Sequence, residues 1–171
     1  YGADILRIWV VASDYSEDLK IDNQIINYQI DSYRKIRNTL RFLLGNLNNF
    51  DKQNLIIPDE MPELERYLLT RISNLNEKLK ELVSRHDYHT IYTALLNFCT
   101  LELSAFYFDI RKDSLYCDDI KSLKRRSTST CLHIIFEFLT KWLSPIVSFT
   151  CEEAWKSRSY SNEESILLQN V

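Results

Sequence analysis

The sequence predicts an all-α protein, a bundle of about four long helices with additional short helices. Glycine and proline, the residues that most often interrupt helices, number only two and three in 171 residues. This scarcity favours long helices over a turn-rich β fold. Apolar residues also recur at intervals of three and four, which places them on one face of a helix. A single domain of this length buries about 70% of the surface that its unfolded chain exposes.

The first two predicted helices occupy the N-terminal part of the chain. Residues 3–12 are so uniformly apolar that we expect a buried helix, and residues 13–18 end it. Asp22 can cap a second, long helix that runs to about residue 47. A polar, asparagine-rich loop is predicted over residues 46–61. The residues of the second helix that we expect to face the core are Ile26, Ile30, Tyr33, Ile36, Leu40, Leu44 and Leu47.

Capping residues and apolar spacing predict the next two helices. Pro62 suits the first position of a helix, where its missing N–H is not needed, and this helix is predicted over residues 62–85. Asp87 is expected to cap a further helix from residue 88 to about residue 108. The residues of helix 62–85 that we expect to face the core are Leu64, Leu68, Ile72, Leu75, Leu79 and Leu82.

Two more helices are predicted in the C-terminal part. One spans about residues 119–143 and ends near Pro145, because proline cannot continue the hydrogen-bond ladder. Thr150 and Glu153 have the spacing of a capping box and predict a short final helix. Residues 165–171 alternate too weakly for any element to be predicted.

Composition excludes several classes of protein. With 45% hydrophobic and 26% charged residues, the chain is neither disordered nor membrane-spanning, and no apolar run approaches the roughly 20 residues of a membrane helix. The net charge of −3 means that any nucleic-acid site must be a local basic patch. Tyr1 opens the chain without an initiator Met, and no secretory signal is visible, so we expect a piece of a longer chain.

No catalytic or metal-binding motif is present. The cysteines lie more than four residues apart, whereas zinc sites usually contain a close pair, so we expect buried, reduced thiols. Ser104 lacks a glycine-flanked elbow, and there is no glycine-rich phosphate loop. Helix capping and packing are a simpler explanation of His86 and His89 than a general base, and His133 stands alone within an apolar helix. The cysteines are Cys99, Cys117, Cys131 and Cys151.

One candidate RNA contact is a basic stripe on the second predicted helix. Arg34, Arg37 and Arg41 lie at positions i, i+3 and i+7, which places them along one line bordering the apolar face. Residues 32–50 contain four basic residues and no acidic one. Guanidinium groups in such a stripe can neutralise RNA phosphates. Alternatively, the arginine stems cover the edge of the core while their heads lie in water.

A second candidate lies around the connection between the last two long helices. Mixed charge suits base recognition, because carboxylates accept hydrogen bonds from base edges while cations hold phosphates. Tyr107 and Tyr116 could offer faces for unstacked bases. Alternatively, this is a solvated loop whose charges pair with one another. The basic residues are Arg111, Lys112, Lys121, Lys124, Arg125 and Arg126, and the acidic ones are Asp113, Asp118 and Asp119.

Several short segments, spread over nearly the whole chain, resemble segments of one protein family and occur in the same order as in that family. Residues 103–117 (LSAFYFDIRKDSLYC) resemble the segment that closes the second helix pair of the anticodon-binding domain in bacterial-type isoleucyl-tRNA synthetases. Residues 1–9 (YGADILRIW) resemble the segment that leaves the catalytic domain of this family after its KMSKS loop. Residues 33–46 (YRKIRNTLRFLLGN) are similar to its first long bundle helix. NFC at 97–99, WLSP at 142–145 and TCEEAW at 150–155 follow in family order.

This resemblance implies one class I synthetase anticodon-binding domain over residues 1–171. Residues 1–20 would connect it to a catalytic domain, and residues 160–171 would begin a C-terminal extension. The domain would bind the anticodon arm of isoleucine tRNA and position this tRNA for ATP-dependent aminoacylation by a domain outside the chain. The chain has no HIGH-type or KMSKS motif, so we expect no catalysis by it alone. The tRNA-binding residues that we expect are Arg34, Arg37, Arg41, Arg111, Lys112, Lys124, Arg125 and Arg126.

The same resemblance implies the remaining partners. ATP and magnesium would serve the whole enzyme rather than these residues, and a zinc-binding module would follow at the C-terminal side. We expect a cytoplasmic monomer that contacts isoleucine tRNA and its own catalytic domain, and neither a membrane nor DNA. Two alternatives stay open: a helical protein–protein interaction module, and the equivalent domain of a valyl or leucyl enzyme. FYFDI at 106–110 with Lys112 and Asp113 favours the isoleucyl branch.

Overall fold

The computed structural model describes residues 2–14, 18–19, 21–48, 50–159 and 164–169. Tyr1 and parts of the predicted interruption 13–18, the connection 1–20, the weakly patterned tail 165–171 and the extension 160–171 lie outside the described residues. The residues within these ranges form helices and no strand, which confirms the all-α prediction. The α-helices are α1 (Ala3–Ala12), α2 (Asn23–Asn46), α3 (Glu63–Ser84), α4 (Tyr88–Asn97), α5 (Phe108–Cys117), α6 (Leu123–Leu143) and α7 (Ser148–Lys156).

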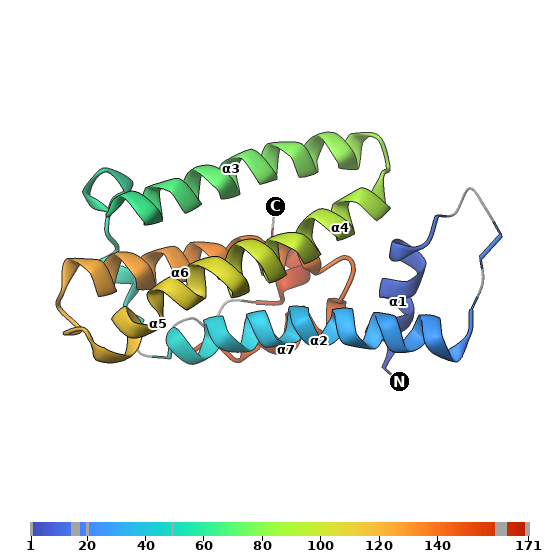
Figure 1. Cartoon of the computed structure of the whole chain (residues 1–171), viewed down its shortest axis with the longest axis horizontal. Coiled ribbons are helices and arrows are strands. Elements are labelled where there is room, and N and C mark those ends of the chain that lie inside the picture. The colour runs from blue at the N-terminus through green and yellow to red at the C-terminus, as the bar shows by residue number, and fades with distance from the viewer. Residues whose placement is uncertain (1, 15–17, 20, 49, 160–163, 170–171) are drawn as a thin grey trace.

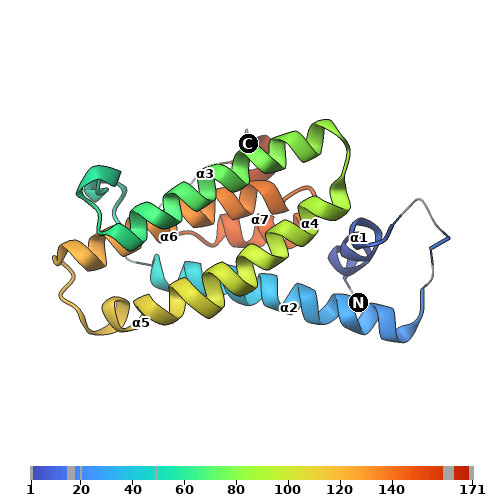
Figure 2. The same ribbon diagram turned by 45° about the horizontal axis from the view of Figure 1, so that its top comes forward.

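The long helices lie side by side and make the bundle. α4, a π-helix η3 (Phe98–Tyr107) and α5 join into one continuous helix, which packs against α2, α3 and α6 (Figures 1 and 2). α1 packs across the N-terminal half of α2, and α7 packs against α6 (Figure 1). Short 3-10 turns complete the connections: η1 (Lys52–Asn54), η2 (Pro58–Glu60) and η4 (Ile166–Leu168).

The predicted core faces of α2 and α3 are confirmed. Every residue that we expected to face inward on these two helices is buried or half-buried. All of them except Ile26 and Ile30 pack into a single hydrophobic core, whose largest fully buried side chains include Trp155, Tyr107, Phe98 and Phe136. Apolar spacing therefore predicted the packing faces as well as the helices.

The prediction that α1 is buried as a whole was wrong. Its bounds are as predicted, but only one face, with Asp4, Ile5 and Ile8, is buried. Leu6 and Val10 on the other face are 50% and 51% exposed. α1 contacts α2, α4 and α7, and these contacts bury a single face of the helix.

The predicted capping box of α7 was also wrong. α7 begins at Ser148, and its first turn is capped by Asp4, which lies 146 positions before Thr150. Asp4 Oδ2 accepts hydrogen bonds from the Thr150 backbone N–H at 2.9 Å and from its hydroxyl at 2.7 Å. Glu153 instead forms an ion pair with Arg37. A carboxylate from α1 therefore meets the free N–H groups of α7 and ties the two helices together.

The helix predicted to end near residue 108 continues to Cys117. Within η3, the Ser104 hydroxyl donates to the Cys99 carbonyl at 2.8 Å, which fits the wider turns of a π-helix. The continuation into α5 buries Phe108, Arg111, Ser114 and Leu115, and the Phe108 ring stacks on Phe42 with ring centroids 4.2 Å apart. By length and composition alone, this 30-residue helix could cross a membrane. Its contacts with three other helices bury apolar residues such as Leu95, Phe98 and Leu103, whereas Leu101, Phe106 and Ile110 are exposed.

A buried carboxylate joins α3, α5 and α6. Glu65 is fully buried and forms a two-pronged ion pair with Arg111, with nitrogen–oxygen distances of 2.7 and 2.9 Å. The hydroxyls of Tyr107 and Thr128 donate to the same carboxylate at 3.1 and 3.3 Å. Arg111 is itself only 8% exposed. The structure therefore argues against Arg111 as a direct tRNA contact, because its guanidinium is held inside the protein by Glu65.

Replacing Arg111 by Met should strongly destabilise the fold. Glu65 would lose its countercharge while staying buried, and breaking a buried ion pair in this way typically costs about 3–5 kcal/mol. Urea unfolding followed by circular dichroism would measure the loss. The matched control is Arg85→Met, which removes an exposed ion pair with Glu81 and should change stability by at most about 1 kcal/mol. Equal, small effects of both changes would contradict a structural role for Glu65–Arg111.

Candidate nucleic-acid interface

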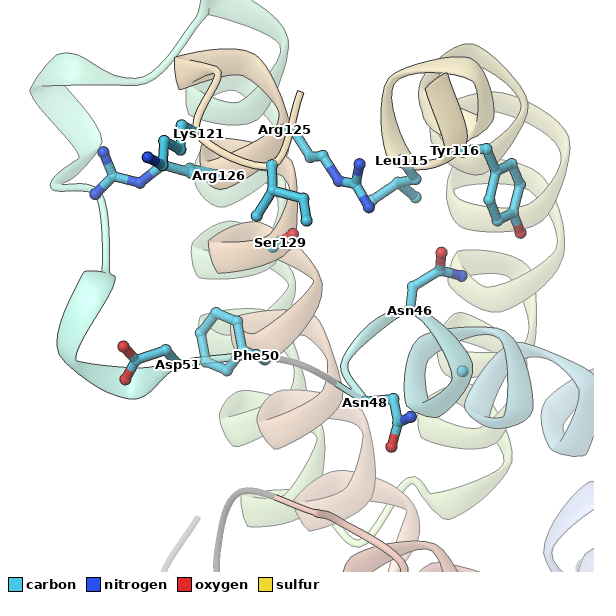
Figure 3. Close-up of a pocket in the computed structure, with 12 residues that line it drawn as sticks. Asn46, Asn48, Phe50, Asp51, Leu115, Tyr116, Lys121, Arg125, Arg126 and Ser129 are labelled. Carbon is cyan, nitrogen blue, oxygen red and sulfur yellow. The ribbon is translucent and has the colours of Figure 1, made fainter. Parts of the chain in front are cut away.

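A groove opens at the end of the bundle where α2 ends and α6 begins. Its volume is about 650 Å³. The end of α2, the segment after it, the last turn of α5 and the first turns of α6 form its walls (Figure 3). We call it the end groove. Its polar lining includes Asn46, Asn48, Tyr116, Lys121, Arg125 and Arg126.

Positive charge dominates one wall of the end groove. Lys121, Arg125 and Arg126 line this wall, and Asp51, on the segment after α2, is the one carboxylate among the described residues that line the groove. The N-terminus of α6 adds a partial positive charge to the same wall. Figure 3 shows Arg125 directed toward α5 and Arg126 directed the opposite way. The positive charge of this wall is therefore spread over two directions and suits an extended polyanion better than one small anion.

The connection from α5 to α6 is held in place by its own hydrogen bonds. The Ser122 side chain accepts from the backbone N–H of Arg125 at 3.2 Å and so caps α6. The Arg125 guanidinium donates to the Asp118 carbonyl at 2.6 Å. We had predicted that this helix begins near residue 119, but α6 begins at Leu123. Arg125 thus holds the connection through the Asp118 carbonyl and also lines the end groove.

The facing wall offers groups that suit bases. Asn46 donates a side-chain hydrogen bond to the Phe42 carbonyl at 2.9 Å, which fixes its amide at the end of α2. Tyr116 is 65% exposed at the end of α5, so a face of its ring is accessible. Aromatic faces stack on unpaired bases, and amides pair with base edges. Opposite walls thus provide contacts for phosphates and for bases.

Two smaller hollows extend the end groove along α2 and α5. The first, of about 400 Å³, shares Asn46 and Tyr116 with the end groove and is also lined by Arg41. The second, of about 290 Å³, shares Phe42 with the first and is lined by Lys112. Arg41 on α2 and Lys112 on α5 therefore lie along one surface that is continuous with the end groove.

The basic stripe on α2 has acidic neighbours that the sequence window 32–50 does not contain. Arg34 pairs with Asp31 at 3.0 Å, and Arg37 lies 3.5 Å from Glu153 of α7. The hydroxyl of Tyr33 and the Glu153 carboxylate raise the pKa of Arg37. Exposed pairs of this kind contribute at most about 1 kcal/mol. A phosphate could therefore replace either carboxylate at small cost.

The structure brings together some predicted site residues and separates others. Lys124, Arg125 and Arg126 share the first turns of α6, and Lys112 pairs with Asp109 on α5 at 2.7 Å. Arg111 points into the core. Sequence reasoning missed the contribution of the 46–51 segment, although its asparagine-rich composition was visible. The missed lining residues are Asn46, Asn48, Phe50 and Asp51.

The cysteines differ from one another in burial. Cys99, Cys131 and Cys151 are buried as predicted, whereas Cys117 at the end of α5 is exposed, which corrects our expectation for that residue. Burial raises the pKa of Cys99 and Cys131 to about 12 and raises that of Cys151 further. Among the residues that the structure describes, no three His, Cys, Asp or Glu side chains are grouped so that they could hold a metal ion.

The histidines have structural contacts. His89 Nδ1 lies 2.9 Å from the Ala12 carbonyl and so links α4 to the end of α1. His133 stacks on Phe50, with ring centroids 4.8 Å apart. His86 occupies the turn between α3 and α4 with a φ of 59°, a left-handed conformation that is uncommon outside glycine.

Comparison with known proteins gives a consistent result. Residues 65–171 match the family described as the anticodon-binding domain of tRNA ligase. The chain is 57% identical over 156 residues to the isoleucine–tRNA ligase of Pelagibacter ubique and 48% identical over 166 residues to that of Ruegeria pomeroyi. It is 40% identical over 169 residues to that of Syntrophotalea carbinolica. These alignments cover 90%, 96% and 98% of this chain but only 17%, 17% and 18% of the relatives.

Cys117 should be the one thiol that reacts rapidly in the folded chain. The thiolate is the reactive form, and burial with a raised pKa suppresses it at the other three cysteines. Brief treatment with iodoacetamide at pH 8, followed by peptide mass spectrometry, would measure each site. Cys117→Ser should abolish the fast reaction. Rapid modification of Cys99, Cys131 or Cys151 before unfolding would contradict the packing described above.

Proposed function

We propose, because this chain belongs to the anticodon-binding domain family of tRNA ligases, that it binds the anticodon arm of isoleucine tRNA. Similarity to isoleucine–tRNA ligases along nearly the whole chain supports the choice of tRNA. The alternative of a helical protein–protein module is not favoured by these matches. The valyl or leucyl alternative is not favoured either, since the relatives named above are all isoleucine–tRNA ligases.

The observation that carries the proposal is the set of three cations in the end groove. RNA is a polyanion, and anticodon-loop bases are unpaired and available for stacking. Lys121, Arg125 and Arg126 are suited to the phosphates, and Tyr116 and Asn46 are suited to the bases. The chain as a whole carries a net charge of −3. Binding would therefore depend on this local patch rather than on overall charge.

The remaining predicted residues extend the proposed interface. Arg41 and Lys112 line the hollows that continue the end groove, and Lys124 is exposed on α6. Arg34 and Arg37 would follow the phosphate backbone after exchanging their exposed carboxylate partners. Arg111 is excluded from this set because it is buried with Glu65.

The chain spans 17–18% of the length of these relatives. Roles in aminoacylation are therefore proposed for an enzyme that includes more than this chain. We propose that the chain positions isoleucine tRNA for ATP-dependent aminoacylation by a catalytic domain of the same cytoplasmic, monomeric enzyme. Residues 1–20 would connect to that domain, and residues 160–171 would begin a C-terminal extension. ATP, magnesium and zinc would bind outside this chain. Among the described residues, no three His, Cys, Asp or Glu side chains are grouped so that they could hold a metal ion. The proposed tRNA binding therefore uses no metal ion held by these residues.

Salt-dependent binding of isoleucine tRNA tests the phosphate contacts. Changing Lys121 and Lys124 together to Ala should reduce the slope of log affinity against log salt by about 0.7–0.9 for each lost phosphate contact. The matched control is Lys78→Ala, an exposed lysine on α3, which should leave the slope unchanged. An unchanged slope in the double variant would remove these lysines from the interface. Absence of tRNA binding by the unmodified chain at low salt would contradict the RNA-binding function itself.

Replacing Tyr116 tests the base contacts. Tyr116→Ala should weaken tRNA binding by about 1–3 kcal/mol, the usual contribution of one stacked base. Tyr116→Phe keeps the ring and should retain most of the affinity. Because the side chain is largely exposed, neither change should unfold the protein. Equal affinities of both variants and the unmodified chain would show that no base stacks on this ring.

A further inference from the structure

Gly45 occupies a position where the fold does not require glycine. It lies in the last turn of α2, and neither described glycine has a positive φ. A side chain is therefore compatible with its backbone conformation. A Cβ built on Gly45 meets no atom within 4 Å. Neither backbone geometry nor packing explains the glycine.

Glycine at this position also has a cost. It is a poorer helix former than alanine, because it loses more conformational freedom when the chain folds. Gly45 lines both the end groove and the hollow that continues it along α2. The space that a side chain would occupy therefore belongs to this continuous surface. An occupant of the surface can use that space, and the protein itself does not.

The charges around Gly45 indicate the chemistry of the occupant. Arg41 lines the hollow on one side, and Lys121 and Arg126 line the end groove on the other. Asp51 is the one carboxylate among the described residues that line these two cavities. Tyr116, which lines both, presents an exposed aromatic ring. An occupant with anionic groups on both sides and a flat face between them fits this surface.

We propose that Gly45 leaves this part of the groove open so that an unpaired nucleotide of the anticodon loop packs directly against the backbone of α2. The nucleotide lies where a side chain would stand, with flanking phosphates near Arg41 on one side and near Lys121 and Arg126 on the other. Gly45 is thus a position where the surface leaves room for a single-stranded RNA segment. This inference rests on the proposed function and adds the place where a nucleotide comes closest to the protein backbone.

Substitution at Gly45 should change stability and binding in opposite directions. Gly45→Ala should raise the midpoint of thermal unfolding by about 1–4 °C, because alanine fits the helix without a clash. The same change should weaken binding of isoleucine tRNA several-fold, and Gly45→Gln should weaken it tenfold or more. The matched control is Ser73→Ala, at an exposed position on α3, which should leave tRNA affinity unchanged.

The outcomes separate this inference from the proposed function. Unchanged tRNA affinity in both Gly45 variants would overturn the inference while the proposed function stands. A lowered unfolding midpoint for Gly45→Ala would also overturn it, since glycine would then serve the fold. If the unmodified chain binds no tRNA at low salt, both fail. Binding of a polyaspartate peptide that weakens in parallel with tRNA would assign the groove to a protein partner and overturn the inference.

Discussion

The buried Glu65 carboxylate sets the geometry on which the candidate site depends. A charge removed from water must be matched by a countercharge and by hydrogen-bond donors. Arg111, Tyr107 and Thr128 supply these donors from the helix 88–117 and from α6. α3, α5 and α6 are therefore held together near the point where α5 ends and α6 begins. The end groove lies beside this point, so the interior ion pair positions an exterior surface.

The functional surface owes its charge to helix ends more than to overall composition. The chain has a net charge of −3, yet the first turns of α6 carry Lys124, Arg125 and Arg126 next to the positive end of the helix. The end of α2 supplies an amide at Asn46 and open space at Gly45. Under the proposed function, phosphates would contact one wall of the groove and bases the other.

The inward faces of helices could be predicted from the sequence, because the periodic spacing of apolar residues alone determines them. Apolar spacing fixed the inward faces of α2 and α3 because a helix can bury only one face against its neighbours. Sequence reasoning failed where contacts come from distant parts of the chain. Arg111 and Lys112 are adjacent and both positively charged, yet the first is buried with Glu65 and the second is exposed beside Asp109. The cap of α7 comes from Asp4, and nothing near Thr150 in the sequence indicates this.

The central claim is that the end groove receives the anticodon loop. It is tested most directly by photochemical crosslinking of isoleucine tRNA that carries 4-thiouridine in its anticodon loop, with the attached peptides mapped by mass spectrometry. The account predicts crosslinks to Tyr116, to Lys121 and to the 45–51 segment, and their loss when unmodified isoleucine tRNA is added in excess. Competable crosslinks confined to α3 or to the exposed face of α1, with none in the end groove, would contradict it.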